Sequence, residues 1–333
     1  MKFPASRPFV AVVLAALTGA AGLVSAPALA APCSGVTFGA GFAGSYTCET
    51  LGSVDGVAPS YGGLTFLNNS TLLIGGAANG AGGTINAVGV VRGAGNHITG
   101  FAGSATLYAT APYIDGGLSF GPGGVLFFTG YSNNTLGQIK PGSTSPDKTV
   151  SLNPALSSVG SIVFVPSGFA GAGGTKLLSY SNGNWANATL TSDGSGTYDV
   201  ESSVVATLAG GPEGAVYVDG DNAGFSGLDS LLVSSYGAGA ISAYQIDANG
   251  DPIVGTLSTF LSGLTGAEGA VIDPVTGDFL FSTFGGSNQV IVVSGFEAPP
   301  PAIPEPTSLA LLGIGLLGLG LRHGFIPGRR RRT

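Results

Sequence analysis

The hydrophobic pattern of the chain is dominated by one short apolar string, which begins with one or two glycines and occurs five times. The copies occupy residues 62–66, 116–120, 160–164, 214–218 and 269–273, at intervals of 54, 44, 54 and 55 residues. Short strings rich in β-branched and aromatic residues predict β-strands. Their return at intervals of this length predicts a repeat architecture in which each repeat supplies one such strand.

Further segments with strand character follow each string. The predicted second strands lie at residues 71–74, 125–129, 176–180, 230–234 and 278–283. The third strand is clearest at residues 240–246 and 289–293, and threonine-rich fourth strands lie at residues 105–109, 148–152, 203–208 and 256–261. The last repeat has no fourth strand, but residues 45–51, which precede the first repeat, fit the fourth-strand pattern.

Five units of four strands predict an all-β fold, a five-bladed β-propeller. Residues 45–51 would complete the last blade from the N-terminal side, which closes the ring and removes two exposed sheet edges. The alternative is a six-bladed ring with a degenerate blade in residues 74–104, whereas a β-sandwich or β-helix suits the repeat length less well. The resemblance to propeller families is one of architecture and implies no function.

The composition agrees with a packed body although glycine is abundant. The 333 residues include 59 glycines and 20 prolines, yet 44% are hydrophobic and only 9% are charged. Disordered chains combine low hydrophobicity with high net charge, and this chain has neither. Glycine follows no strict three-residue period, which excludes collagen.

An apolar run near the N-terminus predicts an export signal. Lys2 and Arg7 precede the uncharged run at residues 9–24, and the small residues Ala28 and Ala30 follow it. A basic start, an apolar centre and a small-residue pair are typical of a secretory signal peptide. We therefore expect a signal helix within a cleaved segment at residues 1–30, followed by the propeller body at residues 31–297.

A second apolar run, near the C-terminus, predicts a membrane anchor. A proline-rich linker at residues 298–306 precedes a leucine- and glycine-rich run, and an arginine cluster closes the chain. The run becomes long enough to cross the hydrocarbon core if Arg322 snorkels to its surface. We expect a transmembrane helix and basic tail at residues 307–333, placed in the inner membrane with the arginines in the cytoplasm.

The tail also carries the tripeptide Pro304, Glu305 and Pro306 immediately before the apolar run. Tripeptide, apolar run and arginine cluster together resemble the PEP-CTERM sorting signal of exopolysaccharide-producing Gram-negative bacteria. The resemblance implies an exosortase, a membrane cysteine-peptidase-like enzyme, as the partner that recognises and processes the tail. It further implies a protein that is exported, anchored before processing, and then located in the cell envelope or outside the cell.

Charge and cysteine content narrow the possible partners of the body. Residues 31–297 contain four basic and 17 acidic side chains, a net charge of −13. Nucleic-acid binding requires a basic face, so that class is excluded. The only cysteines, Cys33 and Cys48, would form a disulfide in an exported protein, and this bond would fix the N-terminal arm to the closing strand.

Acidic residues recur just before the glycine-led strings. Alignment of the five repeats on their glycines places Tyr61, Asp115, Val159, Glu213 and Glu268 at one position. Because inner strands surround the channel of a propeller, the three carboxylates would meet near one mouth and form a metal site suited to Ca²⁺, which prefers oxygen ligands. Alternatively, Glu213 and Glu268 form hydrogen bonds with exposed amides at the strand starts.

The segments around Glu213 and Glu268 also resemble the Glu-Gly opening of gluconolactonase-type propellers. In that family a metal at the channel mouth activates the hydrolysis of sugar lactones. The resemblance therefore implies a metal-dependent hydrolase as an alternative function. The family's asparagine and aspartate ligands have no clear counterpart in this chain.

Other candidate residues are few. His97 is the only histidine of the body and lies in a predicted loop, so we assign no residue a catalytic role. Trp185 lies among three asparagines, where its ring would either stack on a sugar as a ligand-binding residue or pack locally. The sequence thus favours an exported envelope or matrix protein with a non-catalytic binding or structural role toward exopolysaccharide or other envelope proteins.

Overall fold

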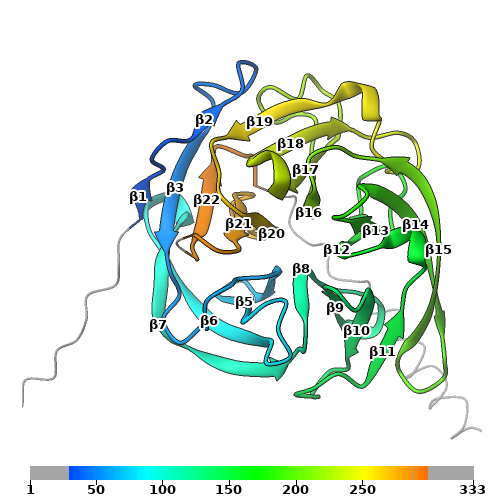
Figure 1. Cartoon of the computed structure of the whole chain (residues 1–333). Coiled ribbons are helices and arrows are strands. Elements are labelled where there is room, and N and C mark those ends of the chain that lie inside the picture. Colours follow the sequence, from blue (N-terminus) through cyan, green and yellow to red (C-terminus); the bar gives the residue numbers. More distant parts are fainter. Residues whose placement is uncertain (1–29, 287, 299–333) are drawn as a thin grey trace, which may run out of the picture.

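The computed structural model describes residues 30–286 and 288–298. Five antiparallel sheets stand around a central axis (Figure 1), so the predicted five-bladed propeller is confirmed. The six-bladed alternative is wrong, because residues 74–104 belong to the strands and hairpins of the first blade. The predicted signal helix, the transmembrane helix and nearly all of the linker lie outside the described residues.

The first three blades are each built from consecutive strands. Blade 1 contains β4 (Leu64–Asn68), β5 (Thr71–Gly76), β6 (Thr84–Arg92) and β7 (Ile98–Thr110). Blade 2 contains β8 (Ile114–Phe120), β9 (Leu126–Gly130), β10 (Thr135–Ile139) and β11 (Lys148–Ser151). Blade 3 contains β12 (Val159–Phe164), β13 (Thr175–Ser179), β14 (Asn184–Ser192) and β15 (Tyr198–Thr207).

The other two blades each have five strands, because the N-terminal segment adds to them. Blade 4 contains β16 (Pro212–Val218), β17 (Ser230–Ser235), β18 (Ala240–Gln245), β19 (Ser258–Ser262) and β2 (Thr37–Phe38). Blade 5 contains β20 (Ala267–Ile272), β21 (Phe279–Thr283), β22 (Val290–Ser294), β3 (Thr47–Gly52) and β1 (Ala31–Pro32). Single 3₁₀ turns are η1 (Ala94–Asn96), η2 (Pro122–Gly124), η3 (Pro154–Leu156), η4 (Tyr236–Ala238) and η5 (Val254–Thr256).

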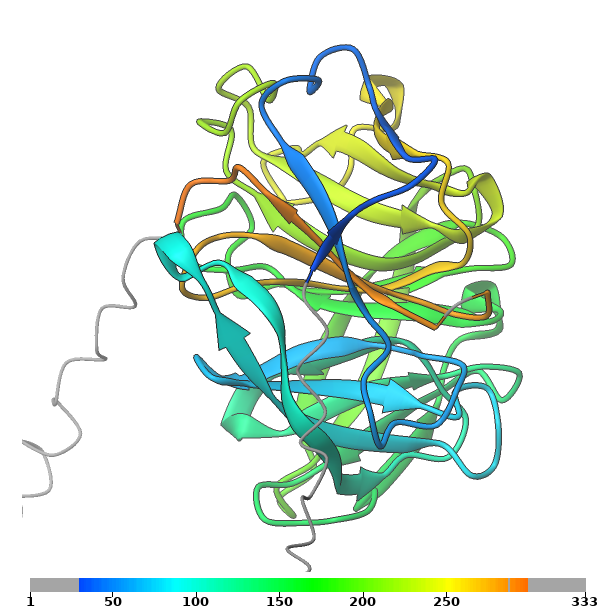
Figure 2. The ribbon, with the colours of Figure 1, turned by 90° about the vertical axis from the view of Figure 1, so that its left-hand side faces the viewer.

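The ring is closed by the pairing that the sequence predicts. Strand β3 lies antiparallel to β22, with Cys48 opposite Val293, and Figure 2 shows this N-terminal strand in blue across the orange C-terminal strands. Strand β1 covers the outer edge of β3, and β2 covers the outer edge of β19. A disulfide joins Cys33, which follows β1, to Cys48 within β3.

The hydrophobic core is divided among the interfaces between blades. Five buried clusters occur in the described chain, and each joins two neighbouring blades. In β5, Leu72 and Ile74 pack toward blade 5 while Leu73 packs toward blade 2. Side chains alternate across a strand, so neighbouring residues of β5 lie on opposite faces of the sheet. Both faces of the blade are therefore buried, and its strands must be apolar on both. This explains the high hydrophobic fraction and the few charges.

The cluster between blades 4 and 5 fixes the N-terminal arm. Phe42 and Tyr46 pack on Phe260, with ring centroids 5.0 and 5.2 Å away, and Phe296 lies 4.6 Å from Tyr46. The Tyr46 hydroxyl donates a hydrogen bond of 2.7 Å to the carbonyl of Ala223. The arm is therefore held by packing and by a hydrogen bond as well as by the disulfide.

In the described part of the chain, no helix has the length and apolar character needed to cross a membrane.

Removal of the disulfide should destabilise the closed ring. The two cysteines are 15 residues apart, and a loop of this size contributes about 3 kcal/mol by restricting the unfolded chain. We expect the Cys33→Ala/Cys48→Ala variant to lose about that much free energy of unfolding in urea titrations. The reduced wild-type protein should match the variant. Equal stability of the oxidised wild-type protein and the variant would contradict the expectation.

Candidate functional site

Three acidic side chains converge at one end of the central channel. Asp115, Glu213 and Glu268 are each the second residue of an inner strand, in β8, β16 and β20. At this point each of the three strands slips in register against its neighbour, as a β-bulge does. A bulge redirects side chains that would otherwise alternate between the two faces of the sheet. The three carboxylates offer oxygens that lie within 4.8 Å of one another.

The other two blades have glycine at the corresponding position. In blades 4 and 5, Pro212 and Ala267 pair with the last residue of the neighbouring strand, and the next residue along the chain is the acid. In blade 3 the residue with this pairing is Val159. The equivalent of the acids in blade 3 is therefore the next residue, Gly160. A β-carbon on Gly160 would lie 2.2 Å from a Glu213 oxygen, so glycine is required there. The glycine-based alignment placed Val159 with the acids, and this was wrong by one residue.

Blade 1 needs the same correction. In blade 4, Gly211 lies two residues before Glu213 and has a positive φ of 65°. In blade 1, Ser60 has the corresponding positive φ of 68°, so the residue two positions later, Gly62, is the equivalent of the acids. Tyr61 packs into the interface between blades 5 and 1. The Tyr61 hydroxyl accepts a hydrogen bond of 2.8 Å from the Val54 amide, which gives it a structural role.

The carboxylates are buried without a compensating positive charge. Their exposed fractions are 1% for Asp115, 4% for Glu213 and 2% for Glu268. Asp115 Oδ2 and Glu213 Oε2 have no hydrogen-bond partner. The four basic side chains of the described body pair with aspartates elsewhere, as follows: Arg92 with Asp273, Lys140 with Asp147, Lys148 with Asp193 and Asp199, and Lys176 with Asp251.

This environment favours the protonated carboxyl groups when no cation is bound. Burial raises the pKa of Asp115 to about 7, against smaller lowering effects of hydrogen bonds with Glu268, Asn79 and the Gly116 amide. Burial also raises the pKa of Glu213 well above its ordinary value, and the nearby Asp115 charge adds to the effect. The pKa of Glu268 is raised well above its ordinary value by burial and by the charges of both neighbours.

An aromatic collar surrounds the cavity above the carboxylates. This cavity has a volume of about 220 Å³, and besides the three acids it is lined by Asn79, Tyr131, Tyr180, Tyr236 and Phe284. We call the last four residues the aromatic collar. Each of them is the first residue after the second strand of its blade. In blade 1 the amide that bonds to the corresponding carbonyl, that of Ser60, belongs to Ala78. Sequence reasoning missed the collar, although this repeated aromatic position was a detectable signal.

The repeat geometry also fixes the backbone of the collar. Each collar residue donates its amide to the carbonyl of the residue just before the inner strand of its own blade, over 2.7 to 2.9 Å. The acceptors are Tyr113, Ser158, Gly211 and Gly266, which all have positive φ. The collar and the acids are therefore positioned by the same backbone turn. Two rings of the collar, Tyr180 and Tyr236, meet edge to face with centroids 5.8 Å apart.

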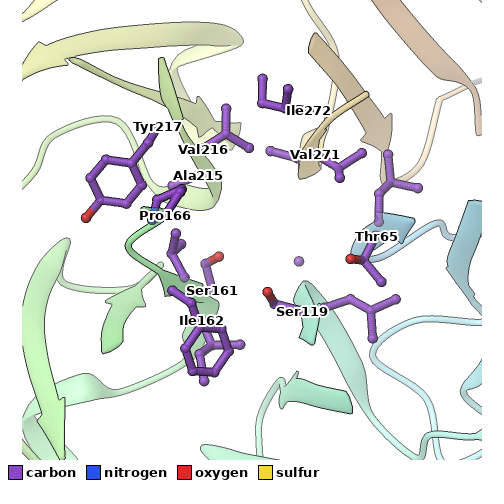
Figure 3. Close-up of a pocket in the computed structure, with 16 residues that line it drawn as sticks. Thr65, Ser119, Ser161, Ile162, Pro166, Ala215, Val216, Tyr217, Val271 and Ile272 are labelled. Atoms are coloured by element: carbon purple, nitrogen blue, oxygen red, sulfur yellow. The ribbon is translucent and has the colours of Figure 1, made fainter. Parts of the chain in front are cut away.

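The opposite end of the channel has different chemistry. A second cavity, of about 170 Å³, is lined mainly by aliphatic side chains, and Figure 3 shows the hydroxyls of Thr65, Ser119 and Ser161 around it. Gly116 lines this cavity, whereas the preceding residue, Asp115, lines the acidic one. Strand β8 therefore lies where the two cavities approach each other, and the acidic groups are confined to one end.

Trp185 is not a surface platform for a sugar, and that interpretation was wrong. The residue lies inside β14, and its side chain is fully buried between blades 3 and 4. Its Nε1 donates a hydrogen bond of 2.8 Å to Asp251 Oδ1, which also accepts one of 2.5 Å from Lys176. The ring is thus part of a buried polar network that joins the two blades.

His97 also has a structural partner. Its Nδ1 lies 2.6 Å from Asp278 Oδ2, and the nearby Arg92 binds both oxygens of Asp273 at 2.6 and 2.8 Å. These pairs connect the outer hairpin of blade 1 to the β20–β21 turn of blade 5. Neither residue lines the acidic cavity. They reinforce the same blade interface that the closing strand completes.

The described chain is thus a five-bladed propeller with an acidic, aromatic-rimmed cavity at one end of its channel. Residues 302–323 match the model of the PEP-CTERM protein-sorting motif. The sequence-based identification of this motif is confirmed. The motif indicates export and sorting to the cell envelope or exterior, and it implies processing by an exosortase.

Comparisons of the body give only distant likenesses. No curated protein matches the chain. A virginiamycin B lyase from Staphylococcus aureus is 14% identical over 70% of this chain and 65% of its own, with a TM-score of 0.35. An auxiliary nutrient binding protein from Bacteroides thetaiotaomicron is 10% identical over 75% of this chain and 76% of its own, with a TM-score of 0.43. Likenesses this distant say nothing about activity.

The buried network around Trp185 should be essential for stability. In Asp251→Ala, the Trp185 Nε1 would lose its acceptor, and the buried Lys176 ammonium would lose its carboxylate and keep only the neutral oxygens of Asn187 and Asn249. Breaking a buried ion pair in this way costs about 3–5 kcal/mol. Urea unfolding would measure this loss. As a control, Asp199→Ala removes a partner of Lys148 at an exposed site and should change stability little. A similarly small loss for Asp251→Ala would contradict the structural role.

Without divalent cations, the acidic cluster should make stability fall as the pH rises. The pKa of Asp115 is about 7 in the fold, above the ordinary 3.8, so folding takes up protons between these values. The stabilisation is complete below about 3.8 and is lost as the pH rises through about 7. Melting temperatures in chelator should therefore be lower at pH 8 than at pH 5, and Asp115→Asn should reduce the difference. An unchanged pH profile in that variant would refute the assignment.

Proposed function

We propose that this exported propeller is a non-catalytic binding protein whose ligand site is the acidic cavity, and that Asp115, Glu213 and Glu268 hold a divalent cation there. The observation that carries the proposal is the convergence of three buried carboxylates within 4.8 Å, two of them with an oxygen that lacks any partner. Burial of three negative charges together is costly unless a proton or a cation neutralises them. A bound cation would replace the missing positive charge.

Calcium suits these ligands best. Ca²⁺ takes about six to eight oxygens at roughly 2.3–2.6 Å, so oxygens on opposite sides of one ion lie about 5 Å apart. The spread of 4.8 Å among the carboxylates is compatible with this size. The carboxylates can supply several of these oxygens, and Asn79 Oδ1, which also has no partner, is a further candidate. Mg²⁺ demands a tighter octahedron and gives up water reluctantly.

The exit point of the chain supports a binding role for this end. The Glu297 amide donates a hydrogen bond of 2.7 Å to Asn222, in the loop that joins β16 to β17. That loop follows the ends of the inner strands, whereas the acids lie at their starts. The described chain therefore leaves the propeller at the face opposite the acidic cavity. If the tail attaches the protein to the membrane, the cavity faces away from it, toward exopolysaccharide or another envelope protein.

A metal-dependent hydrolase of the gluconolactonase type is the second candidate. One observation favours it: the carboxyl groups have raised pKa values beside an accessible cavity, which is the environment of a general acid. Assay of lactone hydrolysis by the calcium-loaded protein, with and without Asp115→Asn, tests this candidate. Turnover that disappears in the variant would favour the hydrolase over a binding protein.

Calcium titration tests the primary proposal. We expect chelator-treated protein to bind Ca²⁺ with measurable heat and to gain about 2.7 kcal/mol of stability when calcium is at a hundred times its Kd. Glu213→Gln removes one charged ligand and should weaken binding at least about tenfold, because hard cations depend on ligand charge. Glu201→Gln, at an exposed position of β15, is the matched control and should bind normally.

Two outcomes would overturn the cation site. One is the absence of both heat and a melting shift in the wild-type protein. The other is a Glu213→Gln variant that binds calcium as tightly as the Glu201→Gln control. Melting curves of both variants in chelator would show that each is folded before the titration.

A further inference from the structure

We propose that the aromatic collar makes the acidic cavity a site for a pyranose ring or a similar polyol. One face of the ring would lie against the collar, and neighbouring hydroxyls would bind the cation held by Asp115, Glu213 and Glu268. The inference rests on the proposed cation site and adds the chemical class of its ligand.

The collar has the properties of a contact surface. Tyr131 is 37% exposed and the other three rings are partly exposed, and all four line the acidic cavity. Four blades place an aromatic residue at the same rim position, fixed by the same backbone hydrogen bond. The ring planes of Tyr180 and Tyr236 make an angle of 88°, and the ring centroids of Phe284 and Tyr236 are 6.3 Å apart. Exposed rings held in place offer apolar area at a small entropic cost.

The polar groups of the cavity match a hydroxyl-rich ligand. Burial raises the pKa of Tyr180, and the charge of Glu213 adds to this effect. Burial also raises the pKa of Tyr236, with a further contribution from Glu268. Both phenols therefore remain hydrogen-bond donors at neutral pH. Asn79 Oδ1 adds an unpaired acceptor, so the rim offers donors and acceptors beside apolar ring faces.

The arrangement also explains why a cation would assist the ligand. The three carboxylates reach the site from the strand starts around the axis, and the cavity lies on their open side. A Ca²⁺ ion with three protein carboxylates still has room for oxygens from the cavity side, and vicinal hydroxyls can supply two of them. A volume of about 220 Å³ is below the range of drug-sized sites, which favours a single terminal ring.

An organic cation is the main competing ligand, since ammonium groups bind aromatic faces. The observations favour a polyol, because three of the four collar residues carry hydroxyls and the cation site already supplies the positive charge. A direct comparison can separate the two classes.

The experiment is a titration of the full propeller body with methyl glycosides of glucose, galactose, mannose and rhamnose, in calcium and in chelator. Tetramethylammonium chloride is the competing probe. We expect at least one glycoside to bind, only with calcium, and about tenfold more weakly in Tyr180→Ala and Tyr236→Ala. The Tyr236→Phe variant keeps the ring and should lose less. Leu107→Ala, at a 62% exposed position of β7, is the control and should bind normally.

The outcomes distinguish this inference from the cation site itself. The collar variants should keep the calcium heat and the melting temperature of the wild-type protein. Normal calcium binding without any glycoside binding would overturn the inference and leave the cation site intact. Glycoside binding that is equal in chelator, or binding of tetramethylammonium alone, would also overturn it. Absence of calcium heat would overturn the proposed function.

Discussion

The pairing of β3 with β22 closes the ring of blades and thereby fixes the geometry of the whole propeller. It supplies the fourth strand of the last blade and brings Leu51 into the interface between blades 5 and 1. Without this pairing, a ring of stacked sheets would have two open edges and no fixed radius. The carboxylates of blades 2, 4 and 5 stay within 4.8 Å only if the radius is fixed. The disulfide and the packing around Phe260 hold the closing strand in place.

The acidic end links stability to ligand binding. The body has few basic residues and commits all four to aspartates outside the channel, so the carboxylates depend on protons or an external cation. In blades 2 to 5, the same turn before the inner strand positions an acid or a glycine at the channel and a collar residue at the rim of the cavity. The repeat thus gives every blade one scaffold, and the residues placed on it make the blades unequal. Gly160 leaves the room that the Glu213 carboxylate occupies.

Much of the fold could be predicted because strand patterns are local and were repeated. The glycine-led strings became β4, β8, β12, β16 and β20, and the unmatched segment at residues 45–51 became the closing strand. The candidate site was harder to predict from the sequence. Alignment on glycines misplaced Val159, because the length of a bulge is set by pairing with the next strand. Trp185 has asparagine neighbours typical of a loop, yet its hydrogen-bond partner, Asp251, lies in the next blade.

The repeat, the closing strand and the sorting motif at residues 302–323 can be recognised from the order of the amino acids alone, since each is encoded in contiguous segments. The shared site of Asp115, Glu213 and Glu268, and the four collar rings around it, become visible only in the folded ring. These residues come from different blades. Their distances depend on the closure of the ring and on bulges that redirect side chains, and neither is encoded near the residues themselves.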